Sequence, residues 1–212
     1  MANTEAKKDR LGTIKDAITA TIALPASFYS TIAWHEIGHG GALVIGSIPS
    51  LPYTLTHELP RYDVIYRGAD RASTIFKFAD EAQRFYYENS LKWQFTSSIG
   101  GHLTTALMGS CFVALGLPRI FDKQASDLTR RIGFLSSMVG STMLLKVIEA
   151  GINEPRSFSS DFTSAISLLK YWQEIPWEQA RLFPTVFVAM TLLAAFGLTS
   201  TTWREYFGKR KM

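Results

Sequence analysis

The chain has 212 residues, 47% of them hydrophobic, with a formal net charge of +4 and one cysteine, Cys111. A chain of this length suits one domain or one compact membrane bundle, and a single cysteine excludes internal disulfides. The basic residues gather beside long uncharged stretches, so they do not indicate a nucleic-acid surface.

Long stretches with few charged residues predict helices that cross a membrane. Such a helix needs about 20 predominantly apolar residues. Four stretches meet this requirement, at residues 17–46, 93–117, 132–151 and 182–203. The third carries Lys146 and Glu149, which are three apart on a helix and can pair. We therefore predict an all-α fold, a polytopic membrane helix bundle that forms one integral-membrane domain over residues 1–212.

Basic residues cluster in three segments, at 7–15, 119–131 and 204–211. Cytoplasmic loops of membrane proteins carry an excess of Lys and Arg. Both termini and the middle segment are therefore expected on the cytoplasmic-type side of a cell inner membrane or an organelle membrane. Residues 50–92 and 153–181 are then expected on the opposite side.

The first span follows a polar start that is expected to be frayed or interfacial. It contains Pro25, a predicted kink, and then reads His-Glu-Ile-Gly-His at residues 35–39. Positions four apart share a helix face, so His35 and His39 can bind one metal ion, with Glu36 beside them as general base. A Glu between two His is costly in an apolar helix unless it is paired or bound to metal. The motif therefore predicts a zinc site.

The polar loop after the first span, at 47–92, contains three prolines and two short runs with strand character, at 53–57 and 62–66. We predict a small β-hairpin that turns near residues 60–61. From Ser73 onward, apolar residues recur at helical spacing and predict an amphipathic helix that leads into the second span. A further short amphipathic helix is expected at residues 162–181.

Two further stretches extend the motif of the first span. The second span contains Gly-His-Leu-Thr-Thr at residues 101–105, and Asn153 precedes Asp161 after the third span. Together with residues 35–39, these stretches resemble the site-2 protease family of intramembrane zinc metalloproteases. That family carries His-Glu-x-x-His on one helix, Gly-Pro-x-x-Asn on a second, and later an Asn upstream of Leu-Asp-Gly.

The resemblance implies roles for the later residues. By this match Asp161 is the third zinc ligand, Asn153 hydrogen-bonds the substrate backbone, and the hairpin presents an edge strand to the substrate. The chain departs from the family pattern in several places. His102 replaces Pro, Thr105 replaces Asn, and Phe162 replaces the Gly after the Asp.

Other residues compete with Asp161 for the third ligand position. Glu154 lies in an Asn-Glu-x-x-Ser stretch similar to the ligand segment of thermolysin-like proteases, although far along the chain from the histidine pair. His102 is a candidate fourth ligand, a hydrogen-bond donor to substrate in the transition state, or a buried core histidine. A three-histidine site is the alternative in which His102 takes the place of Asp161. His57 is expected to be an ordinary surface residue.

Two functions follow from these motifs. The first is an intramembrane zinc metalloprotease that hydrolyses peptide bonds of membrane proteins within the lipid bilayer. The second is a non-proteolytic relative that keeps the fold, with or without the metal, as a subunit of a larger membrane complex. The intact motif at 35–39 favours the first, because a structural subunit has no chemical need for Glu36. The altered second motif favours the second.

Overall fold

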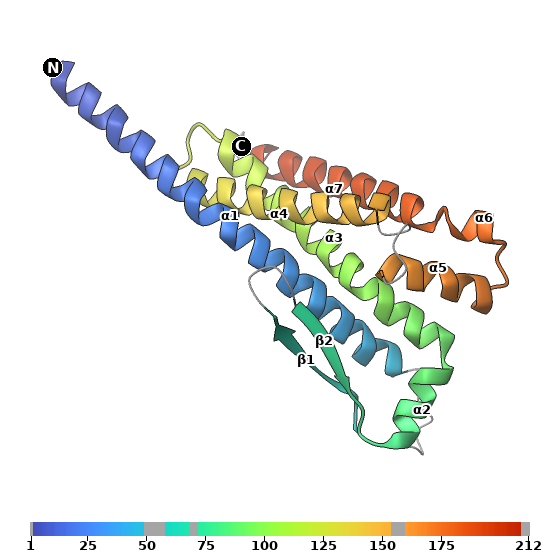
Figure 1. The fold of residues 1–212 in the computed structure, drawn as a ribbon. Helices are drawn as coiled ribbons and strands as arrows, with labels where there is room; N and C mark the ends of the chain where they lie inside the picture. The colour runs from blue at the N-terminus through green and yellow to red at the C-terminus, as the bar shows by residue number, and fades with distance from the viewer. Residues whose placement is uncertain (1, 49–57, 68–71, 154–159, 209–212) are drawn as a thin grey trace.

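The computed structural model describes residues 2–48, 58–67, 72–153 and 160–208, and it is a helical bundle with one two-stranded sheet (Figure 1). This confirms the predicted fold class. Four helices are long and apolar enough to cross a membrane, which is the architecture of a multi-pass membrane protein. They are α1 (Ala2–Ser47), α3 (Leu91–Phe121), α4 (Asp127–Asn153) and α7 (Phe183–Gly208). Each contains one of the predicted spans, apart from the first residue of the fourth.

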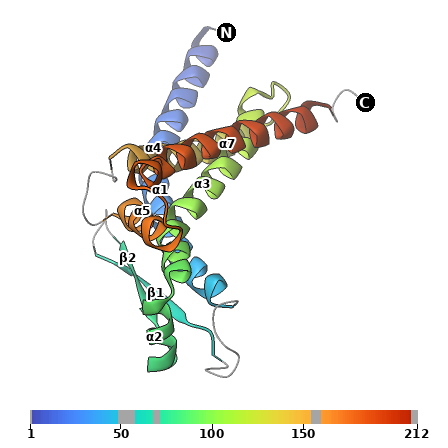
Figure 2. The same cartoon turned by 90° about the vertical axis from the view of Figure 1, so that its right-hand side faces the viewer.

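Helix α1 differs from the sequence prediction at its start. It begins at Ala2 and continues through Pro25 without a break, so the start is helical rather than frayed, and an interfacial position stays a prediction. Its 46 residues correspond to a rod of about 69 Å, more than twice the thickness of a hydrocarbon core. The N-terminal part of α1 accordingly extends well beyond the other helices in both views (Figures 1 and 2).

Helix α3 is central and contacts α1, α4, α5 and α7. Small residues permit its close contacts. Gly109 of α3 faces Gly140 of α4, where an added Cβ would lie 3.0 Å from the opposing carbonyl oxygen. Gly38 of α1 faces Gly100 of α3 in the same way, and a Cβ on either would overlap the other's carbonyl oxygen. Such small-residue contacts let membrane helices approach closely.

The ends of the bundle separate two groups of segments. The first residues of α1, the α3–α4 connection and the last residues of α7 lie toward one end (Figures 1 and 2). The sheet, α2 (Glu81–Asn89) and α5 (Asp161–Trp172) lie toward the other. The segments that carry the three basic clusters thus lie toward one end of the bundle, as the prediction that they share one side of the membrane requires.

The hairpin forms later in the chain than predicted. Strand β1 (Arg61–Tyr66) pairs antiparallel with β2 (Ala72–Lys77), and Val64 lies opposite Thr74. The turn near residues 60–61 and the helix from Ser73 are therefore wrong, while the strand at 62–66 is confirmed. The run at 53–57 lies outside the described residues.

The error has a physical cause. Apolar residues from 75 onward are spaced as on a helix, but the Ser-Thr-Ile-Phe run at 73–76 has β-branched and aromatic residues, which favour strand. The helix begins only after Asp80, whose carboxylate caps it by accepting a hydrogen bond from the Gln83 N–H at 2.6 Å.

The region after the third span forms two helices rather than one. Helix α5 begins at Asp161, and the Ser160 side chain caps it by accepting a hydrogen bond from the Thr163 N–H at 3.2 Å. After α5 ends, Pro176 precedes the short helix α6 (Trp177–Ala180), which leads into α7. The predicted pairing of Lys146 with Glu149 is present on α4, at 2.6 Å.

Candidate metal centre

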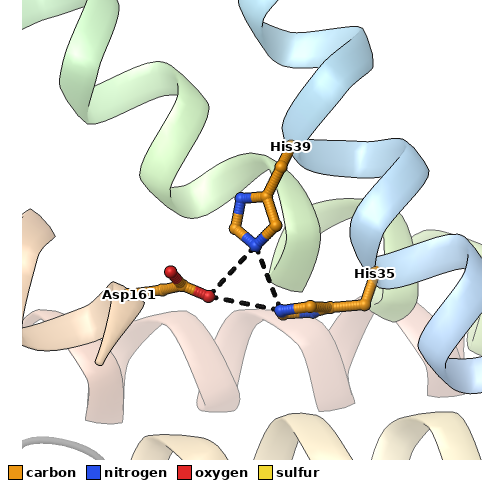
Figure 3. Close-up of side chains that lie close together, drawn as sticks. All are labelled: His35, His39 and Asp161. Atoms are coloured by element: carbon orange, nitrogen blue, oxygen red, sulfur yellow. Dashed lines mark hydrogen bonds and ion pairs between the residues drawn. The ribbon is translucent and has the colours of Figure 1, made fainter. Parts of the chain in front are cut away.

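Three side chains from distant parts of the sequence point at one another (Figure 3). His35 and His39 come from successive turns of α1, and Asp161 comes from the first residue of α5. The two Nε2 atoms lie 3.1 Å apart, and Oδ2 of Asp161 lies 3.2 Å from Nε2 of His35 and 3.1 Å from Nε2 of His39. The structure thus brings together the three residues that the sequence predicted as metal ligands.

The spacing of these atoms suits a small divalent cation. Two ligands held at about 2.0–2.1 Å from a tetrahedral zinc ion lie roughly 3.3 Å from each other. The three donor atoms here are 3.1–3.2 Å apart and form a nearly equilateral triangle. Two imidazole nitrogens and one carboxylate oxygen are also a donor set that zinc accepts, with a fourth position left for water or substrate. The residues therefore fit a zinc ion.

His39 is held in position by a hydrogen bond to the backbone of α3. Its Nδ1 lies 2.7 Å from the carbonyl oxygen of Ser97, so Nδ1 carries the hydrogen and donates it. With Nδ1 engaged in this way, Nε2 faces the centre, where its lone pair would bind a metal ion, as expected of a metal-ligating histidine. Gly101 lies against the same ring, and a Cβ at this position would overlap Nε2 of His39 and lie 2.8 Å from Cε1 of His35. A glycine at 101 is therefore required by the imidazoles.

Asp161 is in the form that a cation needs. Burial raises the pKa of its carboxyl, but the contacts with His35 and His39 lower the pKa by more, so it lies well below the ordinary value. The side chain is therefore a carboxylate at neutral pH. Its position at the start of α5 is fixed by the Ser160 cap on the residue before it.

Glu36 is positioned by a residue that the sequence did not reveal. The Thr74 hydroxyl on β2 lies 2.7 Å from Oε2 of Glu36 and 2.8 Å from its backbone carbonyl oxygen, and its one hydrogen is shared between these two acceptors. The hairpin is thereby attached to α1 at the proposed base. The β-branched run around Thr74 was the available signal, and its helical interpretation hid the contact.

His102 lies beside the centre rather than in it. It is 3% exposed, its Nε2 lies 3.8 Å from Oδ2 of Asp161, and its ring stacks on Phe162 with centroids 4.3 Å apart and an interplanar angle of 7°. Asp161 is the residue that completes the close cluster with His35 and His39, so the geometry favours it over the three-histidine alternative, and the choice of ligands stays a prediction. The stack also joins two departures from the family pattern, since His102 and Phe162 replace Pro and Gly.

The remaining predicted residues lie away from the centre or outside the described chain. Asn153 is the last residue of α4, is exposed, and is not among the residues that line the cavities beside Glu36. Its role in substrate binding stays a prediction. His57 and Glu154 lie outside the described residues.

Comparisons of the chain with models of known protein families, with curated proteins and with solved structures find no match. The assignment of a function therefore depends on the geometry of the centre and on the motif resemblance.

Proposed function

We propose that the protein is an intramembrane zinc metalloprotease that hydrolyses peptide bonds of membrane proteins. The observation that carries this proposal is the meeting of His35, His39 and Asp161 at 3.1–3.2 Å with Glu36 next to His35. The resemblance of the same residues to the site-2 protease motifs supports it independently of the geometry.

Each residue has a distinct chemical task in this proposal. His35, His39 and Asp161 hold the zinc ion, which when bound polarises a peptide carbonyl and acidifies water. Glu36 takes a proton from the attacking water at its carboxylate and later gives it to the leaving amine. Thr74 keeps that carboxylate oriented by donating its hydroxyl hydrogen, so that Oε1 of Glu36 is left for the water.

A non-proteolytic membrane subunit is the second candidate. The observation that favours it is the stack of His102 on Phe162, because both residues replace smaller or more rigid family residues next to the centre. In this alternative the stack fills space that a substrate peptide needs, and the partners are other chains of a membrane complex.

We also propose that both termini lie on the cytoplasmic-type side. The basic clusters at the two ends and at 119–131 support this orientation. Single cysteines introduced at Arg10 and Arg210 in a Cys111→Ser background should both react with an impermeant thiol reagent from the same side of sealed vesicles. Reaction from opposite sides would contradict the orientation.

One comparison tests the function. The full-length protein, purified in mild detergent, is expected to contain one zinc ion per chain and to cleave a membrane-protein substrate. Glu36→Gln should retain the zinc but lose activity by about 10²–10⁴-fold, because an amide is a poor proton acceptor. Zinc without cleavage of any membrane substrate would favour the subunit, and absence of zinc would remove the basis of the protease.

A further inference from the structure

Glu36 lies between two cavities of different chemistry. One has a volume of about 260 Å³ and lies between α1, α3 and α4. The other has a volume of about 440 Å³ and lies between α1, the hairpin, α3 and α5. Among the described residues, Glu36 is the one that lines both cavities. A substrate peptide that passes this proposed base would therefore place one part in each cavity.

The first cavity is lined by polar residues, Lys146 among them, and by an apolar group from two helices. Phe28 and Ile32 of α1 are one helical turn apart and face Val147 and Ala150 of α4 across it. Phe28 is 38% exposed, so the rim of the cavity is at the surface of the bundle. Because α1 and α4 are both candidate membrane spans, we take this rim to face the lipid. We call it the α1–α4 pocket.

The second cavity is polar and continues outward. Besides Glu36 and Asp161 it is lined by the hydroxyl groups of Ser73, Thr74, Ser97 and Ser98. Through Tyr87 and Ser98 it adjoins a cleft of about 540 Å³ between α2, α3 and α5. That cleft adds the hydroxyl groups of Thr163, Ser164 and Ser167. We call the two together the hydroxyl groove.

We propose that the substrate is a peptide segment at a membrane boundary, in which a large apolar residue adjoins small polar residues. The apolar residue would occupy the α1–α4 pocket, where apolar burial favours it. The polar residues and their freed backbone groups would lie in the hydroxyl groove, where serine and threonine side chains satisfy their hydrogen bonds. The bond between the two blocks then lies at Glu36. This inference rests on the proposed proteolytic function.

Binding can be measured without hydrolysis. The probes are fluorescent peptides in bicelles: a run of leucines followed by a run of serines, the reverse order, and an alternating peptide of the same composition. The protein is full-length Glu36→Gln loaded with zinc. One of the two block orders is expected to bind at least about tenfold tighter than the alternating peptide, as is typical for filling one apolar pocket.

Substitutions in each cavity test which part of the peptide binds there. Phe28→Ser, at an exposed rim, should remove most of the block preference, and Ile32→Ser should do the same if the first variant folds poorly. Ser164→Leu, exposed on α5, should weaken binding of the serine block. Leu193→Ala is the matched control, because Leu193 is 72% exposed on α7 and lines neither cavity. Its peptide affinity should be unchanged.

The outcomes separate the inference from the function. Equal affinity for the block and alternating peptides, or a block preference that survives both pocket variants, would overturn the inference. If the wild-type protein cleaves other sequences as efficiently as the block peptide, the proteolytic function stands and the inference about the substrate fails. If the block peptide binds preferentially but is never cleaved, the inference stands and the protease function fails.

Discussion

Helix α1 packs against the helices α3 and α4 in different ways. Against α3 the backbones touch at Gly38 and Gly100, and the Trp93 indole of α3 donates a hydrogen bond of 2.7 Å to the Leu43 carbonyl of α1. Against α4 the helices leave a pocket of about 260 Å³ at the level of His35. One face of the helix is therefore tightly packed and the other is open.

The difference assigns separate tasks to the two faces. On the α3 side, His39 is oriented by the Ser97 carbonyl and confined by Gly101, so the protein itself holds this proposed ligand in position. On the α4 side, His35 and Glu36 border the open pocket, where another molecule can approach. Tight packing therefore orients the proposed ligands, and the looser contact with α4 leaves room for another molecule beside them.

Among the substitutions that test the tight contact between α1 and α3, Gly101→Ala should have the largest effect. The new methyl group would overlap Nε2 of His39, so both imidazoles would have to move away from Asp161. Zinc affinity should fall by more than the roughly 100-fold loss that follows removal of an outer partner of a ligand. Zinc retained after dialysis against a graded chelator series measures this, and circular dichroism checks that the helices persist.

Gly41→Ala is the control for this substitution. It lies on α1 two residues after His39, and an added Cβ meets no other atom within 4 Å. Its zinc affinity should equal that of the wild type. Equal loss in both variants would show that the effect comes from changing a glycine and not from contact with the imidazoles.

Thr74→Val should have the next largest effect. It removes a hydrogen bond to the proposed catalytic carboxylate, which is worth about 1.5–3 kcal/mol and so about 10–100-fold in kcat. Zinc content and KM should not change, and Thr74→Ser should restore activity. Thr201→Val is the matched control, because the Thr201 hydroxyl donates within its own helix α7, to the Gly197 carbonyl at 3.0 Å.

The contact between Thr74 and Glu36 can also be tested without an activity assay. In Thr74→Val, amide hydrogen exchange in β2 should be faster than in the wild type, because the strand has lost its attachment to α1. Unchanged exchange together with unchanged kcat would contradict the positioning role of Thr74.

The tight face was only partly predictable from the sequence. Helical spacing was enough to place His35 and His39 together, because a four-residue interval fixes a shared face whatever surrounds it. Gly101 was noticed as part of a family motif, but its contact with the imidazoles depends on how α1 and α3 cross. Thr74 was missed because its position depends on the pairing of two strands, which a local apolar pattern does not specify.

Trp93→Phe should weaken the tight face to a smaller extent. The indole is fully buried and donates to a carbonyl that already belongs to a helix, so the loss is one hydrogen bond and some packing. We expect a decrease of about 1–2 kcal/mol in the free energy of unfolding. A denaturant titration in detergent, followed by circular dichroism, measures it. No change would mean that the glycine contact alone holds α1 against α3.

Asp16→Asn addresses the open face and should have the smallest effect. Asp16 of α1 pairs with Arg131 of α4 at 2.7 Å. Its side chain is 74% exposed, so water and salt screen the attraction, and Arg131 keeps its second partner, Asp127, at 3.0 Å. The unfolding midpoint in the same titration should therefore not move measurably. A decrease as large as that of Trp93→Phe would mean that α1 is held as firmly against α4 as against α3, and the contrast between the two faces would be wrong.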